Sequence, residues 1–148
     1  MSRYPIWWCD TITIFNKYEN SQTNLVTWYK TTVSGVFWKA SGSKVIVGTE
    51  VLDSKSILCR IPKNPHFLER VEWENLPNDQ MSEYFTLGLG DIIVKGDVSD
   101  VIDEYTAGHR STDLLERYKP SQRCFEVEEF ANNTGIGRNN EHYYARGR

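Results

Sequence analysis

The stretch DTITIF, from Asp10 to Phe15, decides the predicted fold of this chain. Its isoleucines alternate with threonines, and β-branched residues at a period of two are typical of a β-strand. The run TWYKTTVSGVFWKA, from Thr27 to Ala40, has the same β-branched and aromatic character. It is too long for one typical strand, so we expect a bulge or a bend at Gly35.

The middle of the chain continues this pattern. We expect a turn at Ser41–Lys44, followed by a short strand at Val45–Val47. Ser54–Ile61 is a further predicted strand, and Pro62 ends it because proline has no backbone donor. Gly88–Gly96 is predicted as a turn, a buried strand and a second turn.

The last third of the chain holds the one predicted helix. Asp113–Tyr118 begins with an acid that can cap the helix, and a glutamate three residues later can reach back to it. Val98–Tyr105 combines helical spacing with β-branched residues, so helix and strand both stay open there. Arg123–Phe130 and Glu141–Ala145 are predicted strands that pair as a C-terminal hairpin.

Many short strands with one short helix indicate a mainly β fold, a small β-barrel or sandwich with long loops and extended termini. Pro62–Gln80 is the longest predicted loop and should hold little regular structure. No Pro-, Gly- and Ser-rich linker divides the 148 residues, so we expect a single β-rich domain over residues 1–148. Residues 1–9 would form an N-terminal arm and residues 131–148 a C-terminal hairpin or arm.

The composition argues against several classes of protein. No run approaches the ~18 apolar residues of a membrane-spanning helix, and we expect no secretory signal because the N-terminus lacks its apolar core. Three widely spaced cysteines do not make a disulfide framework and favour a reducing compartment. A net charge of −3 and a pI near 5.6 argue against a surface covered by a nucleic-acid-binding groove.

Candidate catalytic and metal-binding residues do not gather in a motif. His66, His109 and His142 lack metal-ligand spacing, and the glycine runs match no phosphate-binding loop. Carboxylates cluster at Asp97–Glu104 and at Glu126–Glu129, where solvated or interface charge is the simplest interpretation. We therefore expect no catalytic residue, no cofactor and no metal, in a protein that is not an enzyme.

Aromatic and basic side chains gather near both ends of the chain. Trp7 and Trp8 either fold back onto the core or dock on a neighbour, and both alternatives stay open. The adjacent C-terminal tyrosines lie between arginines, Arg138 before them and Arg146 after them. This composition is found at protein interfaces and also where phosphates and bases are bound. We predict interface contacts from Trp7, Trp8, His142, Tyr143, Tyr144 and Arg146.

Several segments occur in a particular order along the chain: Asp10–Lys17, Trp28–Val33, Gly35–Trp38, Gly90–Gly96, Leu114–Tyr118, Asn140–Tyr143 and Arg146–Gly147. This order resembles a group of small structural proteins of tailed phages and prophages. These are the head–tail connector components of the head-closure (stopper) or neck type. The resemblance spans about Asp10 to Gly147 and brings no catalytic motif with it.

The resemblance implies a small β-barrel that assembles as a ring in the virion, after synthesis in the host bacterial cytoplasm. The implied function is to join the portal or adaptor to the tail and to help retain packaged DNA. Its partners would be copies of itself, the portal or adaptor, and tail proteins, with no membrane. Double-stranded DNA would pass through the lumen without sequence recognition, and an acidic lumen would not hold its phosphates.

Two segments are candidates for a lumen or docking element, Pro62–Gln80 first and Ser41–Glu50 second. We also expect removal of Glu141–Arg148 to block particle assembly and to leave a folded monomer. A tail-completion or terminator protein is an alternative function that shares the ring. A single-stranded nucleic-acid-binding β-barrel, with Trp and Tyr as stacking platforms, is another. A small hydrolase is disfavoured because no nucleophile is paired with a base.

Overall fold

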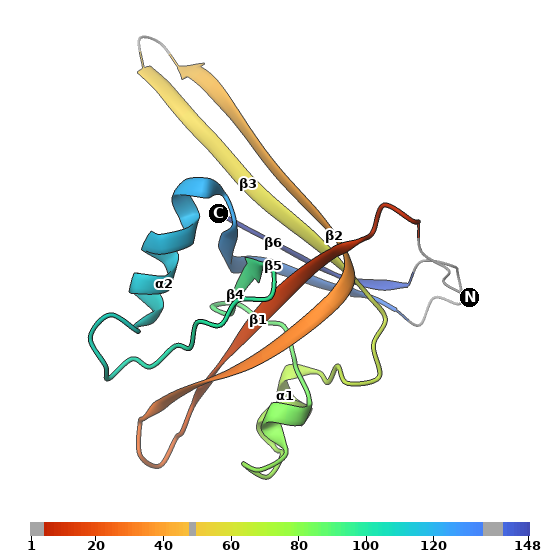
Figure 1. Ribbon diagram of the computed structural model, residues 1–148, viewed down its shortest axis with the longest axis vertical. Coiled ribbons are helices and arrows are strands. Elements are labelled where there is room, and N and C mark those ends of the chain that lie inside the picture. The colour runs from red at the N-terminus through yellow and green to blue at the C-terminus, as the bar shows by residue number, and fades with distance from the viewer. Residues whose placement is uncertain (1–4, 48–49, 135–140) are drawn as a thin grey trace.

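Among the described residues, six antiparallel strands close into a barrel, which confirms the mainly β prediction and selects the barrel over the sandwich (Figure 1). The computed structural model describes residues 5–47, 50–134 and 141–148, without the side chains of residues 41–55. Around the barrel the order is β1–β2–β3–β6–β5–β4, and β4 pairs with β1. The strands are β1 (Asp10–Glu19), β2 (Val26–Val47), β3 (Glu50–Pro62), β4 (Ile92–Lys95), β5 (Cys124–Asn133) and β6 (His142–Gly147).

Two short α-helices lie in the described connections, α1 (Arg70–Glu74) before β4 and α2 (Ser111–Tyr118) after it. α2 is the predicted helix, but its N-cap is Arg110. Asp113 lies in the first turn, where its Oδ2 accepts the Arg110 N–H at 3.1 Å. The predicted capping position is therefore wrong by three residues, because the acid binds back to the cap from inside the helix.

β1 forms where predicted, but its residues are buried on both faces of the sheet. Ile12 and Ile14 belong to an apolar cluster inside the barrel, whereas Phe15 belongs to a second cluster outside it. Thr13 is also buried, and its Oγ1 accepts the Val98 N–H at 3.2 Å. The chain after β4 thus covers the outer face of β1, and the barrel wall separates two apolar clusters.

Gly35 is a β-bulge, as predicted. Thr11 pairs with Ser34 and Asp10 pairs with Val36, so Gly35 has no partner in β1. Its φ of +76° lies in the region that glycine adopts without steric cost. The first part of β2 pairs with β1 and the second part pairs with β3, so the bulge lies where one long strand changes partners.

Beyond the barrel, β2 and β3 continue as a two-stranded ribbon, residues 41–47 and 50–56 (Figure 1). In the described pairings these residues pair with one another and with no third strand. The predicted turn at Ser41–Lys44 is wrong, because cross-strand pairing carries these turn-forming residues into β2. Val45–Val47 is part of the same strand, and the connection to β3 follows it.

Two apolar clusters hold the barrel and its covering segments together. The inner cluster takes residues from all six strands, and the outer cluster lies between the barrel wall and α2. Val98–Tyr105 forms neither helix nor strand, so both alternatives for it are wrong. Val98 and Ile102 still explain its apolar spacing, because both are buried in the outer cluster.

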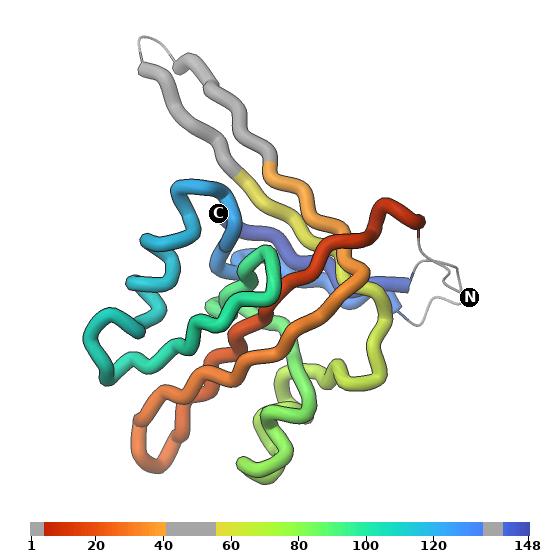
Figure 2. The backbone as a smooth tube through the Cα atoms, in the orientation of Figure 1, coloured from red at the N-terminus to blue at the C-terminus, as the bar shows by residue number. Residues whose placement is uncertain are grey.

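The segment between β3 and β4 lies below the barrel in the view of Figure 2. Its Trp73, on α1, is fully buried and donates from Nε1 to the Met81 carbonyl at 3.2 Å. The Trp73 ring meets the rings of Tyr18 and Tyr29 edge-on, with centroids 6.1 and 5.6 Å apart. Pro62–Gln80, predicted to hold little regular structure, is thus one helical turn and irregular chain ordered around a tryptophan.

β5 and β6 form the predicted C-terminal hairpin, and residues 135–140 between them lie outside the described part of the chain. β6 pairs with β5 on one side and with β3 on the other, so it closes the barrel and is not a free arm. These pairings count against the expectation that removal of Glu141–Arg148 leaves a folded monomer. That truncation opens the barrel between β3 and β5 and uncovers the inner cluster.

Candidate functional site

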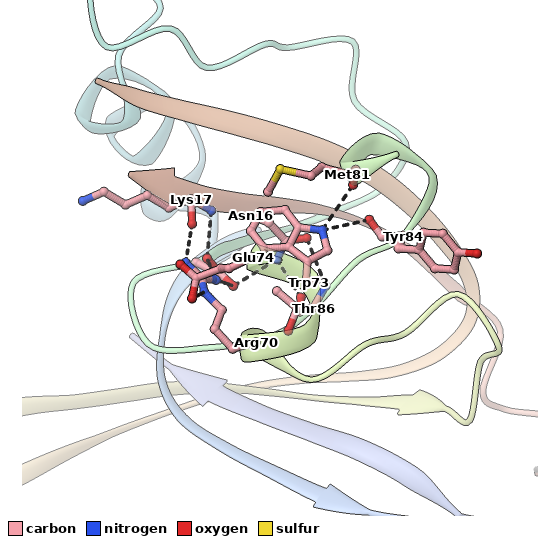
Figure 3. A network of polar contacts seen from close by, with 9 residues as sticks. Asn16, Lys17, Arg70, Trp73, Glu74, Met81, Tyr84 and Thr86 are labelled. Atoms are coloured by element: carbon pink, nitrogen blue, oxygen red, sulfur yellow. Dashed lines mark hydrogen bonds and ion pairs between the residues drawn. The ribbon is translucent and has the colours of Figure 1, made fainter. Parts of the chain in front are cut away.

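A buried carboxylate lies immediately before β4 and is held by donors from distant parts of the chain (Figure 3). Asp91 accepts hydrogen bonds from Arg70 Nη1 at 3.0 and 2.9 Å, from Asn16 Nδ2 at 2.9 Å and from the Lys17 N–H at 2.9 Å. Asn16 also donates to the Thr86 carbonyl at 2.6 Å and accepts the Thr86 N–H at 3.3 Å. The network joins β1, α1 and the chain that leads into β4.

Burial is the dominant influence on Asp91 and raises its pKa above the usual range. The Arg70 guanidinium, the Lys17 N–H and the Asn16 amide act in the opposite direction and lower the same pKa. Because Asp91 has no exposed surface, its carboxylate cannot reach a substrate in solution. We assign this network to holding α1 against β1 rather than to acid–base chemistry.

A cavity of about 530 Å³ is lined by a residue that precedes β1 and by residues of β3, β5 and β6. Its lining residues are Trp8, Arg60, Asn133, His142 and Tyr144. The Trp8 ring lies edge-on to His142, with centroids 5.8 Å apart. Arg60 has no ion pair to a carboxylate among the described residues, so it brings an uncompensated positive charge to this cavity.

The exposed residues next to this cavity extend it into a larger patch. Ile6 is 93% exposed and Trp7 is 63% exposed, and both immediately precede Trp8 in the chain. We name Ile6, Trp7, Trp8, Arg60 and His142 the N-terminal surface. Aromatic and arginine side chains together are the composition of protein-interface hot spots.

The structure brings together four of the six residues predicted at an interface. Trp8, His142 and Tyr144 line the cavity, and Trp7 stands exposed beside it. The sequence left open whether the tryptophans fold back onto the core or dock on a neighbour. Trp8 folds back against the rings of Phe37 and His142, whereas Trp7 stays exposed. Arg146 lies in the other half of β6, where its Nη1 is 4.0 Å from Glu129 Oε2.

Tyr143 was predicted at the interface, but its side chain is buried in the core. It is 4% exposed, and its ring stacks on Phe67 with centroids 3.9 Å apart. Its hydroxyl group donates to the Asn64 carbonyl at 3.4 Å. Strand alternation places Tyr143 inside the barrel and Tyr144 outside it, so adjacent tyrosines of β6 have different roles.

Replacing Tyr143 by phenylalanine should lower the free energy of unfolding by about 0.5–1.5 kcal/mol, the usual net value of a hydrogen bond. The stacking on Phe67 is retained, so the loss reports the hydroxyl group alone. Tyr144→Phe is the matched control and should change stability by less than about 0.5 kcal/mol. Urea denaturation of both variants is the measurement, and equal losses would contradict the assignment of Tyr143 to the core.

A second exposed patch lies at the opposite side of the molecule, between the β1–β2 connection and the chain after β4 (Figure 1). Leu25, Val101 and Tyr105 are 53%, 61% and 61% exposed. The Tyr105 hydroxyl accepts the Val26 N–H at 2.9 Å, which joins the two segments. We name Leu25, Val101, Asp103 and Tyr105 the loop surface.

Asp103 gives the loop surface a stable negative charge. The Tyr105 N–H, at 2.9 Å, and the Thr106 hydroxyl, at 2.8 Å, donate to its two oxygens. These hydrogen bonds, the Tyr105 N–H first, hold the pKa of the exposed Asp103 carboxyl below its usual range. The loop surface is thus apolar with an acidic edge, whereas the N-terminal surface is apolar with a basic edge.

A cavity of about 700 Å³ lies between α2 and the end of the barrel, with Cys124 and Leu115 among its lining residues. Burial raises the pKa of the Cys124 thiol to about 11. Burial also raises the pKa of the Cys59 thiol. Both side chains are therefore protonated at neutral pH, and neither is an activated nucleophile.

In the part of the chain that the structure describes, no group of three or more His, Cys, Asp or Glu side chains is placed to hold a metal ion. Across residues 5–47, 50–134 and 141–148, no helix is long and apolar enough to cross a membrane.

Sequence reasoning missed both the buried network and the loop surface. The position of Asp91 directly before the apolar run Ile92–Val94 was the available sign that its carboxylate is buried. Its partners Arg70 and Asn16 lie 21 and 75 residues away in the chain, and no local sequence pattern predicts contacts over such separations. Leu25, Val101 and Tyr105 stand in polar segments, where isolated apolar residues give no pattern of their own.

Comparison with known proteins identifies one family. The model of DUF6751, a family of unknown function, matches residues 8–148 of the chain. Corresponding searches of curated proteins and of solved structures give no match.

Proposed function

We propose that this chain, which belongs to the DUF6751 family, is a structural component of the head–tail connector of a tailed phage or prophage, of the head-closure or neck type. It forms a ring with copies of itself, joins the portal or adaptor to the tail and helps to retain packaged DNA. The observation that carries this proposal is the β2–β3 ribbon, which extends a closed barrel by two strands without a third partner in the described pairings.

A ribbon of this kind serves assembly because both of its outer edges carry backbone donors and acceptors that can pair with another chain. Exposed strand edges add to neighbouring sheets, and natural proteins cover or blunt them unless they have a use. The barrel itself is closed, so it offers few such edges. Ser41–Glu50, the second candidate docking element from the sequence, lies in and around the end of this ribbon.

The charge and the exposed side chains support the same proposal. The chain has a net charge of −3, which suits a channel through which DNA must slide without adhering. Five of the seven large hydrophobic side chains that are exposed among the described residues lie in the N-terminal surface or the loop surface. Exposed apolar patches of this kind mark protein–protein contacts.

A shortened ribbon tests the proposal without disturbing the barrel. Removing residues 42–47 and 50–55 joins Ser41 to Gly48 and Thr49 to Ser56. The Ser41–Ser56 pair lies six pairs from the Val47–Glu50 pair, so it is of the same type in the alternating ladder and accepts the same two-residue connection. All residues of the inner cluster are retained.

In the phage expected to encode the protein, a stop codon in its gene should yield heads that lose their packaged DNA, together with separate tails. Wild-type protein supplied in trans should restore joined particles, and the shortened variant should not, although its unfolding transition in urea matches that of the wild type. Electron microscopy and plaque counts are the measurements. Infectious particles made without the protein would overturn the proposal. Full rescue by the shortened variant would overturn the role given to the ribbon.

The location of the wild-type protein separates the connector from the tail-terminator alternative. In a lysate whose heads and tails are not joined, a connector protein should be recovered with the heads, whereas a terminator should be recovered with the tails.

A single-stranded nucleic-acid-binding function has one observation in its favour. Trp8, Tyr144 and Arg60 line one cavity, and such side chains stack on bases and bind phosphates. The net charge opposes it, and titration with an oligonucleotide at two salt concentrations decides, because binding of this kind weakens steeply with salt.

A further inference from the structure

We infer that the N-terminal surface of one copy docks on the loop surface of a second copy, so that each subunit contacts two neighbours head to tail. This inference rests on the proposed function and specifies the subunit contact that the proposed ring requires. Its partner is a second copy of this chain and not another protein of the virion.

The first support is the distribution of exposed apolar side chains. Ile6 and Trp7 lie on one surface, and Leu25, Val101 and Tyr105 lie on the other. The remaining two exposed large hydrophobic residues of the described chain, Val71 and Leu89, belong to neither surface. These side chains expose apolar area to water on two separate surfaces. Burying that area between two copies lowers the free energy and so favours association.

The second support is complementary charge. Arg60, on the N-terminal surface, has no carboxylate partner among the described residues. Asp103, on the loop surface, is exposed and accepts only local hydrogen bonds among those that the described residues show. A contact between the two surfaces therefore pairs an acid with a base, whereas contact of either surface with its own copy sets like charges together.

The third support is the position of the two surfaces. They lie on opposite sides of the molecule, with the start of the described chain on the right of Figure 1 and the β1–β2 connection on the left. Two different surfaces on opposite sides make a heterologous contact, which leaves one free surface of each kind at the ends of any open assembly. Such contacts repeat until the rotation between subunits closes a ring.

The two surfaces are defined by few residues, whereas a standard stable interface has about 20–30 residues a side, so we expect a single pair of copies to associate weakly. Closure of the ring makes the last contact intramolecular and raises the overall stability through effective concentration. We therefore expect association that depends strongly on protein concentration, with closed rings as its end point.

Cysteine cross-linking tests the contact directly, because the chain supplies half of the pair. Cys9 is exposed two residues after Trp7, and Cys59 and Cys124 are buried. Val101→Cys places a second exposed thiol on the loop surface. Val71→Cys is the matched control, because Val71 is 71% exposed but lies on α1, outside both surfaces.

The purified variants should be oxidised with a mild disulfide-forming reagent at high protein concentration and then separated without reducing agent. Val101→Cys should give a ladder of linked copies that ends at a fixed size, and Val71→Cys should not. A Val101→Cys protein that stays unlinked, or that links no better than the control, would overturn the inference. The measurement uses pure protein, so it fails or succeeds independently of whether virions contain the protein.

Substitution of Trp7 gives a second test of the contact, one that needs no oxidation. Trp7→Ser should weaken self-association by about 30-fold or more, as removal of an interface hot spot does. Val71→Ser should leave it within about 2-fold, as expected for a residue outside the contact. Sedimentation equilibrium of both variants gives the constants, and equal constants would contradict the proposed contact.

Discussion

Replacing Arg70 by methionine should lower the free energy of unfolding at pH 7 by about 3 kcal/mol. Removing one partner of a buried ion pair costs about 3–5 kcal/mol, because the other charge stays buried without compensation. The lower end applies because the Arg70 side chain is 30% exposed, whereas Asp91 is fully buried. Methionine keeps an unbranched aliphatic side chain but loses the guanidinium, whose carbon lies 5.3 Å from the centroid of the Trp73 ring.

The deficit of this variant should depend on pH with a definite sign. The pKa of Asp91 in the fold is raised by burial, and Arg70 opposes that rise. A raised pKa means that the contribution of Asp91 to stability is fully present below its unfolded pKa of about 3.9 and is lost as the pH rises through the folded value. Loss of Arg70 raises the folded pKa further, so the deficit should be largest at neutral pH and should shrink as the solution is acidified.

Arg146→Met is the control for the Arg70 experiment. Arg146 pairs with Glu129 at the surface, where the two side chains are 51% and 60% exposed. Exposed ion pairs contribute about 0–1 kcal/mol, so this variant should lose little stability. Urea denaturation between pH 4 and pH 7 measures both variants. A deficit for Arg70→Met that equals the control, or that does not change with pH, would contradict the role assigned to the network.

Replacing Gly147 by alanine should be at least as damaging. Gly147 lies in β6, opposite Ile57 of β3 and Val127 of β5. An added Cβ would overlap the carbonyl oxygen of Glu126 and would lie 2.8 Å from Cδ2 of Phe125. The carbonyl belongs to a paired strand and cannot rotate away, so we expect a loss of about 3 kcal/mol or more, at the upper end of overpacking costs.

Gly88→Ala provides the matched comparison. A Cβ at Gly88 would meet its nearest atom, Nη1 of Arg70, at 3.6 Å, which is ordinary contact. Its φ is not in the positive region, so alanine should be neutral or should stabilise the fold by about 0.4–1 kcal/mol through the unfolded state. Thermal unfolding of the two variants should differ clearly, and similar midpoints would mean that β6 is not packed as the barrel requires.

The sequence predicted those parts of the fold that depend on local pattern. The β-branched alternation of Asp10–Phe15 became β1, and the isolated Gly35 became the bulge. The turn predicted at Ser41–Lys44 failed because serine and glycine favour turns locally, whereas pairing with β3 determines their conformation in the hairpin. The burial of both faces of β1 also depends on segments that join it from much later in the chain.

In the candidate surfaces, too, local sequence pattern predicted some features, and others depended on contacts between distant parts of the chain. The aromatic pair at Trp7 and Trp8 was visible as composition, but only the fold separates the exposed ring from the one that folds back. Tyr143 and Tyr144 are adjacent in sequence and lie on opposite sides of a strand, so composition alone assigned them together. The Asp91 network required contacts between residues up to 75 positions apart, which no local signal encodes.

The proposed connector function is best tested by electron cryomicroscopy of the neck of the phage expected to encode the protein, with the protein located by its barrel and ribbon. We expect copies of this chain in a ring between the head and the tail, with each β2–β3 ribbon against another chain. Particles that are complete and infectious but contain no copy of this protein would contradict it.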